Sequence, residues 1–136
     1  MNLYSNLKQR GSLILACAGV LMSAVATPAL AERAELAADR VAYSWQASTP
    51  GATHVVRQEG ARWLRLRFDA IELPAGSVLR LTSLADGARQ HLNATTAAQW
   101  RNTSAYFNGA AVRVELLAAE GVAGARVVLA EVVAGR

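Results

Sequence analysis

The sequence predicts an all-β domain behind a signal peptide: an antiparallel, jelly-roll-like β-sandwich of about seven to eight strands. Three observations predict it. An apolar N-terminal segment ends in small residues, apolar and polar residues then alternate at every second position, and turns containing Gly or Pro separate the alternating runs. The 136 residues give room for one domain with a core of its own.

The N-terminal segment has the three parts of a secretory signal peptide. Basic residues precede an apolar run over residues 13–25, and small residues then lead to a cleavage site between Ala31 and Glu32. We therefore expect residues 1–31 to be removed and the mature protein to be exported, periplasmic or extracellular, without a stable membrane span. The apolar run is shorter than the roughly 20 residues that cross a bilayer, which disfavours an uncleaved anchor.

The only cysteine, Cys17, lies inside this leader. Ile14-Leu15-Ala16-Cys17 has some likeness to a lipoprotein cleavage box, in which the cysteine is lipidated. However, Leu15 stands where a small residue is preferred, and the apolar run continues past Cys17. We interpret Cys17 as an ordinary apolar residue of the leader, which leaves the mature chain without disulfide or thiol chemistry.

Removal of the leader also changes the charge. Without Lys8 and Arg10, the chain has twelve arginines against ten acidic residues and no lysine, a net charge of about +2 instead of +4. The arginines are spread along the chain. This bias is too weak to indicate nucleic acid or an anionic membrane as a partner.

The mature chain begins with a segment of different character. Residues 32–40 are charged and Ala-rich, and we expect a flexible or short helical arm there. The β-sandwich domain then occupies residues 41–136. Its first two strands are expected at residues 41–46 and 53–57.

The clearest strand covers residues 62–69. Leu64, Leu66 and Phe68 face one way, while the polar residues between them face the other. A helix would scatter these residues around its circumference, so the alternation decides for a strand. Further strands are expected at 78–84, 89–93, 104–107, 112–116 and 126–133.

Turn residues separate these strands. Asp86-Gly87 and Asn108-Gly109 are each predicted to form a two-residue hairpin turn between the strands beside them. Strands of this length and spacing, each with one polar face, favour two sheets packed face to face. A small barrel remains the alternative.

The order of the turns and strands resembles a known domain. Pro50-Gly51-Ala52 is followed by an apolar strand ending in Arg67-Phe68, by Leu73-Pro74-Ala75-Gly76, by the strand at 78–82 and by Asp86-Gly87. Later come Phe107-Asn108-Gly109 and a Val-Arg-Val-Glu-Leu strand at 112–116. This order is similar to the β-sandwich that precedes the catalytic domain in secreted, mostly bacterial, trypsin-like and lysyl-endopeptidase-like serine proteases.

The resemblance covers most of residues 41–134 and implies a non-catalytic accessory or pro-region domain. Such a domain would assist folding, keep a protease latent or bind a partner. The protease part of such a protein would begin after Arg136, so the resemblance carries no catalytic residue to this chain. The implied partner is a secreted protease domain.

Catalytic and metal sites find little support in the residues. His54 and His91 are the only candidate bases, and no serine lies in a Gly-x-Ser-x-Gly or Gly-Asp-Ser-Gly context. Two histidines 37 positions apart, without cysteine or clustered acids, match no metal-ligand spacing. We expect no enzyme activity, no cofactor and no metal, and a small hydrolase is the least favoured hypothesis.

Asn93 and Asn102 each begin an N-glycosylation triplet. The Arg-for-Lys, Ala-rich composition is typical of a bacterial G+C-rich genome, where this modification is not expected. We interpret both as polar loop residues.

Trp100, Arg101 and Tyr106 form the candidate partner-binding site. Aromatic and arginine side chains in a polar segment are typical of interface hot spots, and aromatic rings also stack on sugars. A carbohydrate or another cell-surface polymer is therefore an alternative partner. The competing interpretation is that Trp100 plugs the open end of the sandwich. The outward Arg65, Arg67 and Arg113 would suit an acidic partner, although solvated strand faces are the default.

Overall fold

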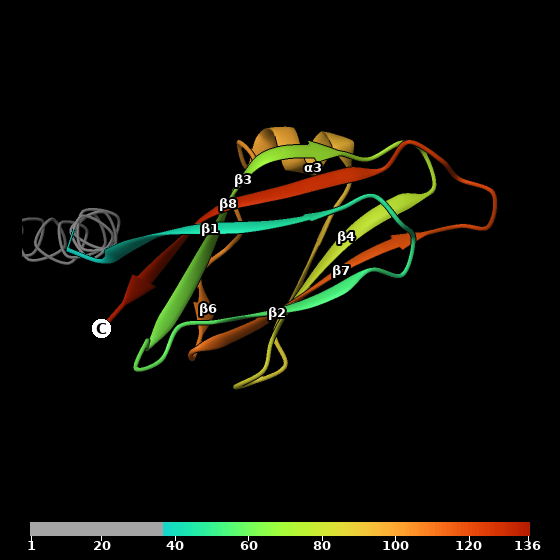
Figure 1. The fold of residues 1–136 in the computed structure, drawn as a ribbon. Helices are drawn as coiled ribbons and strands as arrows, with labels where there is room; N and C mark the ends of the chain where they lie inside the picture. Colours follow the sequence, from blue (N-terminus) through green and yellow to red (C-terminus); the bar gives the residue numbers. More distant parts are fainter. Residues whose placement is uncertain (1–36) are drawn as a thin grey trace, which may run out of the picture. The chain divides into compact units, whose positions relative to one another are not determined.

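The computed structural model describes residues 37–136, which form two antiparallel sheets and one short helix (Figure 1). The predictions for the leader, for its cleavage between Ala31 and Glu32 and for Cys17 lie outside the described residues. No helix within the described part is long and apolar enough to cross a membrane. The elements are β1 (Asp39–Ala47), β2 (Thr53–Arg57), β3 (Trp63–Glu72), β4 (Ser77–Ser83), β5 (Arg89–Leu92), α3 (Ala94–Gln99), β6 (Phe107–Asn108), β7 (Ala111–Ala118) and β8 (Arg126–Gly135).

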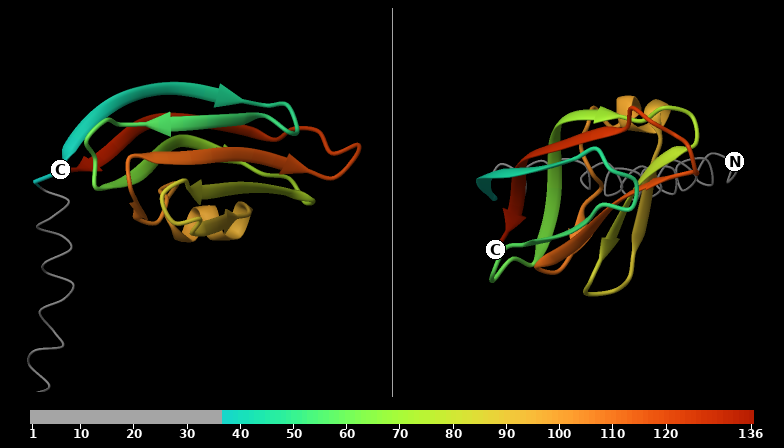
Figure 2. Two further views of the ribbon diagram at one scale, coloured as in Figure 1. Left: turned by 90° about the horizontal axis from the view of Figure 1, so that it is seen from below. Right: turned by 45° about the vertical axis from the view of Figure 1, so that its right-hand side comes forward.

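The strand order confirms the jelly-roll sandwich. Sheet A has the order β1-β8-β3-β6 and sheet B the order β2-β7-β4-β5. Successive strands alternate between the sheets, except that β4 and β5 form a hairpin within sheet B. Figure 2 shows the two sheets as separate layers. The chain thus forms a two-sheet jelly roll with every pairing antiparallel.

Inward-facing side chains from both sheets form one core. The predicted alternation of β3 is confirmed, because Leu64 and Leu66 are fully buried and Phe68 is 6% exposed. Strands of both sheets contribute the other large buried side chains, among them Leu79, Leu81, Leu92, Val112, Val114, Leu116, Val127, Leu129 and Val132. Burial of this apolar surface is the main stabilising term of the fold.

The alternation in β8 changes phase halfway along the strand. Val127 and Leu129 are buried in its first half, and Val132 and Ala134 in its second half. The pairing of β8 with β1 shifts register between Glu131 and Leu129, and its pairing with β3 shifts register in the same part of the strand. These bulges let both halves of β8 turn apolar side chains toward the core, and they leave Glu131 on the outer face of sheet A.

The helix α3 is a correction to the sequence analysis, which expected a polar loop here. Asn93 is its N-cap: the Asn93 side chain accepts a hydrogen bond from the Thr96 amide at 2.9 Å, and Thr96 Oγ1 accepts one from the Asn93 amide at 2.8 Å. Such a capping box satisfies two backbone donors that helix ends otherwise leave unpaired. Ala97 is 1% exposed and belongs to the core, so α3 closes the sandwich where it contacts β3 and β5.

Removing this cap is expected to weaken the local structure. Asn93→Ala should lower the free energy of unfolding by about 1 kcal/mol, because the Thr96 amide loses its side-chain acceptor, whereas the bond from the Asn93 backbone amide to Thr96 does not depend on the side chain. Urea denaturation measures the loss. Asn93→Asp, which keeps an acceptor oxygen, is the matched control and should retain most of the stability. Equal losses in both variants would contradict the role of the cap.

The hairpin predicted at Asn108-Gly109 is wrong. β6 pairs with β3 in sheet A, whereas β7 pairs with β2 and β4 in sheet B, so these two residues carry the chain between sheets. Gly109 has a φ of +94°, and a Cβ there would lie 2.6 Å from Ala85 Cβ. Glycine is therefore required at position 109 by the positive φ and by the close approach of Ala85, and these constraints also arise outside hairpins.

Two further boundaries differ from the prediction. β1 begins at Asp39, so Asp39 and Arg40 belong to the sandwich rather than to the expected arm, whose residues 32–36 lie outside the described part. The strand expected at 104–107 shrinks to Phe107–Asn108. Before it, Ser104 bonds to the β3 backbone through both its amide and its hydroxyl, which pairs the edge of β3 without a regular strand.

Candidate functional site

The predicted site residues Trp100 and Arg101 lie at the C-terminal end of α3. Trp100 is the C-cap residue and is 42% exposed, so the interpretation of Trp100 as a plug is wrong and Ala97 fills that place. Arg101 and Asn102 follow in the left-handed region, with φ of +53° and +57°. This turn brings the Asn102 carbonyl to the Phe68 amide at 2.8 Å, which fixes the segment that presents Trp100.

Tyr106, the third predicted residue, packs with residues of β3 on the outer face of sheet A. Its ring meets the Trp63 ring edge-on, with centroids 5.1 Å apart, and the Arg65 guanidinium lies 4.9 Å from its centroid. Arg65 Nη1 also donates to the Tyr106 hydroxyl at 3.2 Å. Sequence reasoning missed this grouping, because Trp63 and Arg65 are about 40 residues away in the chain.

The arginines on the outer face of sheet A are engaged within the molecule. Arg65 donates to the Ser104 carbonyl at 3.1 Å and to Thr103 Oγ1 at 3.0 Å. Arg40 and Arg67 each lie 3.3 Å from the same carboxylate oxygen of Glu131, one from either side. These guanidinium groups brace three strands and the segment before β6.

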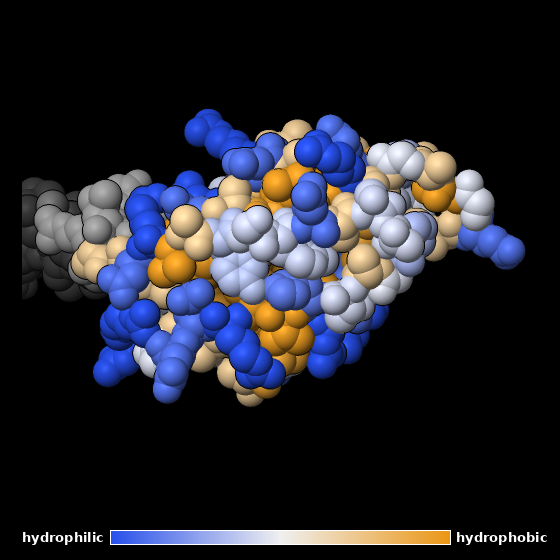
Figure 3. Space-filling model, in the orientation of Figure 1, coloured by the Kyte–Doolittle hydropathy of each residue, from blue (hydrophilic) through white to orange (hydrophobic). Residues whose placement is uncertain are grey.

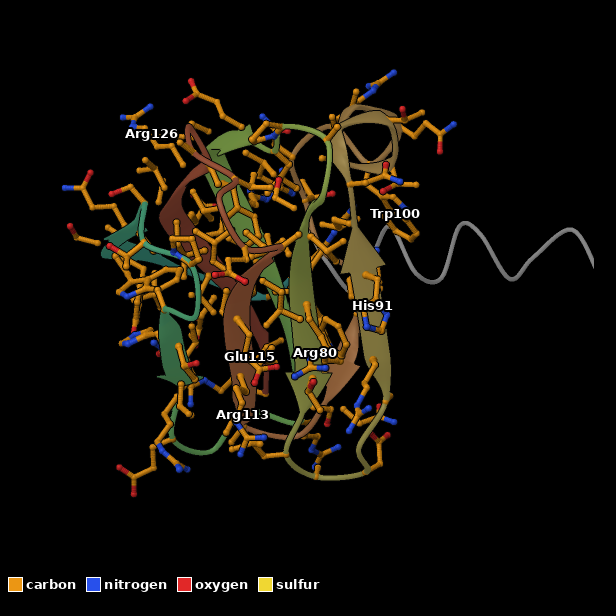
Figure 4. The ribbon with its side chains drawn as sticks, turned by 90° about the vertical axis from the view of Figure 1, so that its right-hand side faces the viewer. Arg80, His91, Trp100, Arg113, Glu115 and Arg126 are labelled. Atoms are coloured by element: carbon orange, nitrogen blue, oxygen red, sulfur yellow. The ribbon has the colours of Figure 1, made fainter. Side chains whose placement is uncertain are left out.

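The outer face of sheet B is arranged differently. Two adjacent rows of side chains cross its four strands, and we call them the arginine face. One row is Thr53, Glu115, Arg80 and His91, and the other is Val55, Arg113, Thr82 and Arg89. Arg80 Nε lies 2.6 Å from Glu115 Oε2 (Figure 4). Neither Arg89 nor Arg113 forms an ion pair or hydrogen bond within residues 37–136.

The electrostatics of this face centre on Glu115. The hydrogen bond from Arg80 lowers the pKa of the Glu115 carboxyl, against the opposing effect of burial, and the charges of Arg80, Arg113 and Arg89 lower it further. Three guanidinium groups thus act on one carboxylate. The arginine face therefore carries excess positive charge even with Glu115 ionised.

This ion pair predicts a pH dependence of stability. Because the pKa of Glu115 is lower in the folded state, its contribution is present above the ordinary glutamate pKa of 4.5 and is lost as the pH falls through the folded-state value. Glu115→Gln should cost on the order of 1 kcal/mol at pH 7 and close to nothing at pH values low enough to protonate Glu115. Urea denaturation of both proteins across this range measures it. The same difference at every pH would contradict the assignment.

The two histidines do not converge. His54 faces inward from β2, where its Nε2 lies 2.6 Å from the Tyr43 hydroxyl and its ring stacks on Trp45 at 5.2 Å. His91 faces outward from β5, at the opposite edge of sheet B.

Figure 3 views the molecule from the flank of β1 and β2, where apolar surface lies among charged side chains.

The described residues contain no recognised catalytic arrangement of the kinds considered in the sequence analysis. No serine hydroxyl there is hydrogen-bonded to either histidine, and no three His, Cys, Asp or Glu side chains are grouped to hold a metal ion. An open hollow of about 520 Å³ is lined by residues 73–78 and 93–95, none of which carries a charge. Within residues 37–136, the arginine face is a surface on which two arginines in one row, Arg89 and Arg113, form no ion pair or hydrogen bond.

Comparison of the chain with protein-family models, with curated proteins and with solved structures finds no match in any of the three.

Proposed function

We propose that this chain is an exported, non-catalytic module that binds a protein partner outside the cytoplasm. The observation that carries the proposal is the arginine face, where Arg89 and Arg113 form no ion pair or hydrogen bond within the described residues. Arginine is enriched at protein interfaces, since its planar guanidinium group makes several hydrogen bonds at once. The contrast with sheet A, where Arg40, Arg65 and Arg67 are all engaged, supports the choice of surface.

The partner class follows from the resemblance to the accessory domain of secreted serine proteases. The turns that carry the resemblance lie between β1 and β2, between β3 and β4 and between β4 and β5. They follow one another along the chain in the order that the resemblance implies. In this role the module would help a protease domain to fold, keep it latent or recruit it. Export would bring the module and its partner into the same compartment.

A pull-down from culture supernatant tests the proposal. The gene is expressed with its leader, and the exported product is tagged at its C-terminus and recovered. We expect N-terminal sequencing to begin at Glu32 and a secreted protease or protease fragment to be enriched. Retention of the leader would reject export by cleavage, and absence of any enriched protease would reject the partner class.

A carbohydrate-binding module is the second candidate, and the exposure of Trp100 favours it. An indole on a short, fixed turn offers a flat apolar surface that suits a sugar ring. Tyr106 is also exposed, at 45%, but its ring is already in contact with Trp63 and Arg65, so we rest this candidate on Trp100. Retention of the protein on an insoluble polysaccharide that is lost in Trp100→Ala would replace the first proposal with this one.

A further inference from the structure

The arginine face already contains an example of the contact that it would make with a ligand. In one row, Arg80 holds the Glu115 carboxylate at 2.6 Å. In the adjacent row, Arg113 and Arg89 flank Thr82 on the two neighbouring strands. Strands lie about 4.8 Å apart, so the backbones carrying these two arginines are roughly 10 Å apart. Two further carboxylate positions therefore adjoin the one that Glu115 occupies.

Burial at the centre of the row supports this picture. Thr82 points outward, yet it is only 7% exposed, while Arg89 and Arg113 on either side are exposed. Aliphatic stems of flanking arginines that lie along the sheet would cover such a residue and leave the guanidinium groups at the surface. The charged ends are thus available to a ligand without a change in the strands.

The carboxylate of Glu115 limits the class of ligand that the arginine face can bind. Glu115 is the only acidic residue in the two rows, and it lies on β7, the strand that also carries Arg113. A densely charged polymer, such as a nucleic acid or a sulfated polysaccharide, would place anionic groups against Glu115. A protein segment with separated carboxylates avoids this repulsion and matches the forked donors of arginine.

We infer that the arginine face binds an acidic segment of a protein partner, whose carboxylates pair with Arg89 and Arg113. This inference rests on the proposed function and names its surface and the chemistry of its ligand. In Figure 4, Trp100 lies beyond the end of β5, past His91, where it adds an apolar contact at the border of the same surface.

A peptide-binding measurement tests the inference. The probe is a fluorescein-labelled dodecapeptide with glutamate at every third position and serine or alanine between, and a matched peptide carries glutamine instead. The full gene product is compared with Arg89→Gln/Arg113→Gln. The control Arg62→Gln/Arg126→Gln removes the same charge from exposed positions outside the arginine face.

The expected result is binding of the glutamate peptide that weakens about tenfold in the arginine-face variant and less than about twofold in the control. The glutamine peptide should not bind. Equal weakening in both double variants would overturn the inference in favour of net charge alone. Binding of heparin or of phosphatidylglycerol vesicles without binding of the glutamate peptide would overturn it in favour of another class of ligand.

The same variants separate this inference from the proposed function. If wild type and arginine-face variant capture the same protease from culture supernatant equally well, the function stands and the surface is wrong. If the wild type captures none while the glutamate peptide still binds specifically, the surface stands and the protease partner is wrong. Thermal unfolding of each variant, expected to be unchanged, verifies that only the surface differs.

Discussion

Leu66→Ala is expected to lower the free energy of unfolding by about 2–5 kcal/mol, the largest single loss among our predictions. Leu66 is fully buried in β3, where its backbone lies between Val132 of β8 and Ser104. Truncation removes apolar burial and leaves a cavity that the surrounding sheets fill only in part. For a domain of this size, such a loss is a large share of the total stability.

Chemical denaturation of the two proteins measures this effect. Leu84→Ala is the matched control, because it makes the same chemical change at a side chain that is 38% exposed. We expect the control to change stability by about 0.5 kcal/mol or less. A loss for Leu66→Ala no larger than that of the control would contradict the position of the core.

Gly135→Ala is expected to cost about 1–3 kcal/mol, although it adds only one methyl group. The backbones of Gly135 and Trp63 are paired in sheet A, and a Cβ on Gly135 would lie 2.0 Å from Trp63 Nε1. The indole must then leave its place and give up its edge-on contact with Tyr106. Tryptophan fluorescence should therefore shift toward that of a solvated indole together with the loss of stability.

A double-mutant cycle isolates this contact. In a Trp63→Ala background, the three atoms nearest to the methyl group of Gly135→Ala are gone, and its cost should fall to a few tenths of a kcal/mol. The difference between the two backgrounds reports the steric conflict alone. The same cost with and without the indole would show that the substitution disturbs the backbone conformation and not the packing of Trp63.

Much of the fold follows from local sequence, and β3 shows why. Its alternation of Leu and Arg requires a strand with one buried face, and the position of each residue on its face was predictable without knowledge of the partner strands. The same holds for the β4–β5 hairpin at Asp86-Gly87, which the structure confirms as a hairpin with a longer loop than two residues.

The features that sequence reasoning missed depend on contacts between distant segments. Asn108-Gly109 has the composition of a hairpin turn, but its neighbours belong to different sheets, and strand order decides that. The helix α3 has only six residues and no apolar periodicity. Its signal is the Asn93–Thr96 capping pair, in a segment that the sequence analysis interprets as a polar loop.

The candidate site shows the same division. Exposure of Trp100 follows from its place at the end of α3, which sequence analysis did not predict. The outward direction of Arg65 and Arg113 was predictable from alternation. However, only the structure shows that Arg65 is held by Ser104 and Thr103, whereas Arg113 has no ion pair or hydrogen bond within residues 37–136. Hydrogen bonds and ion pairs with residues distant in the chain thus decide which arginine side chains remain available to a ligand.

The pairing of the first strand with the last has a consequence for how this domain fits into longer polypeptides. Asp39 lies opposite Ala134 in sheet A, and Arg136 Nε lies 2.8 Å from Asp39 Oδ2. Figure 2 shows the start of β1 beside the C-terminus. A polypeptide that enters through β1 leaves through β8 at nearly the same point. The domain is thus suited to insertion into a surface loop of a host protein, because the flanking ends stay together. For the same reason, a short linker between these ends would permit circular permutation, with new termini opened at the β4–β5 loop.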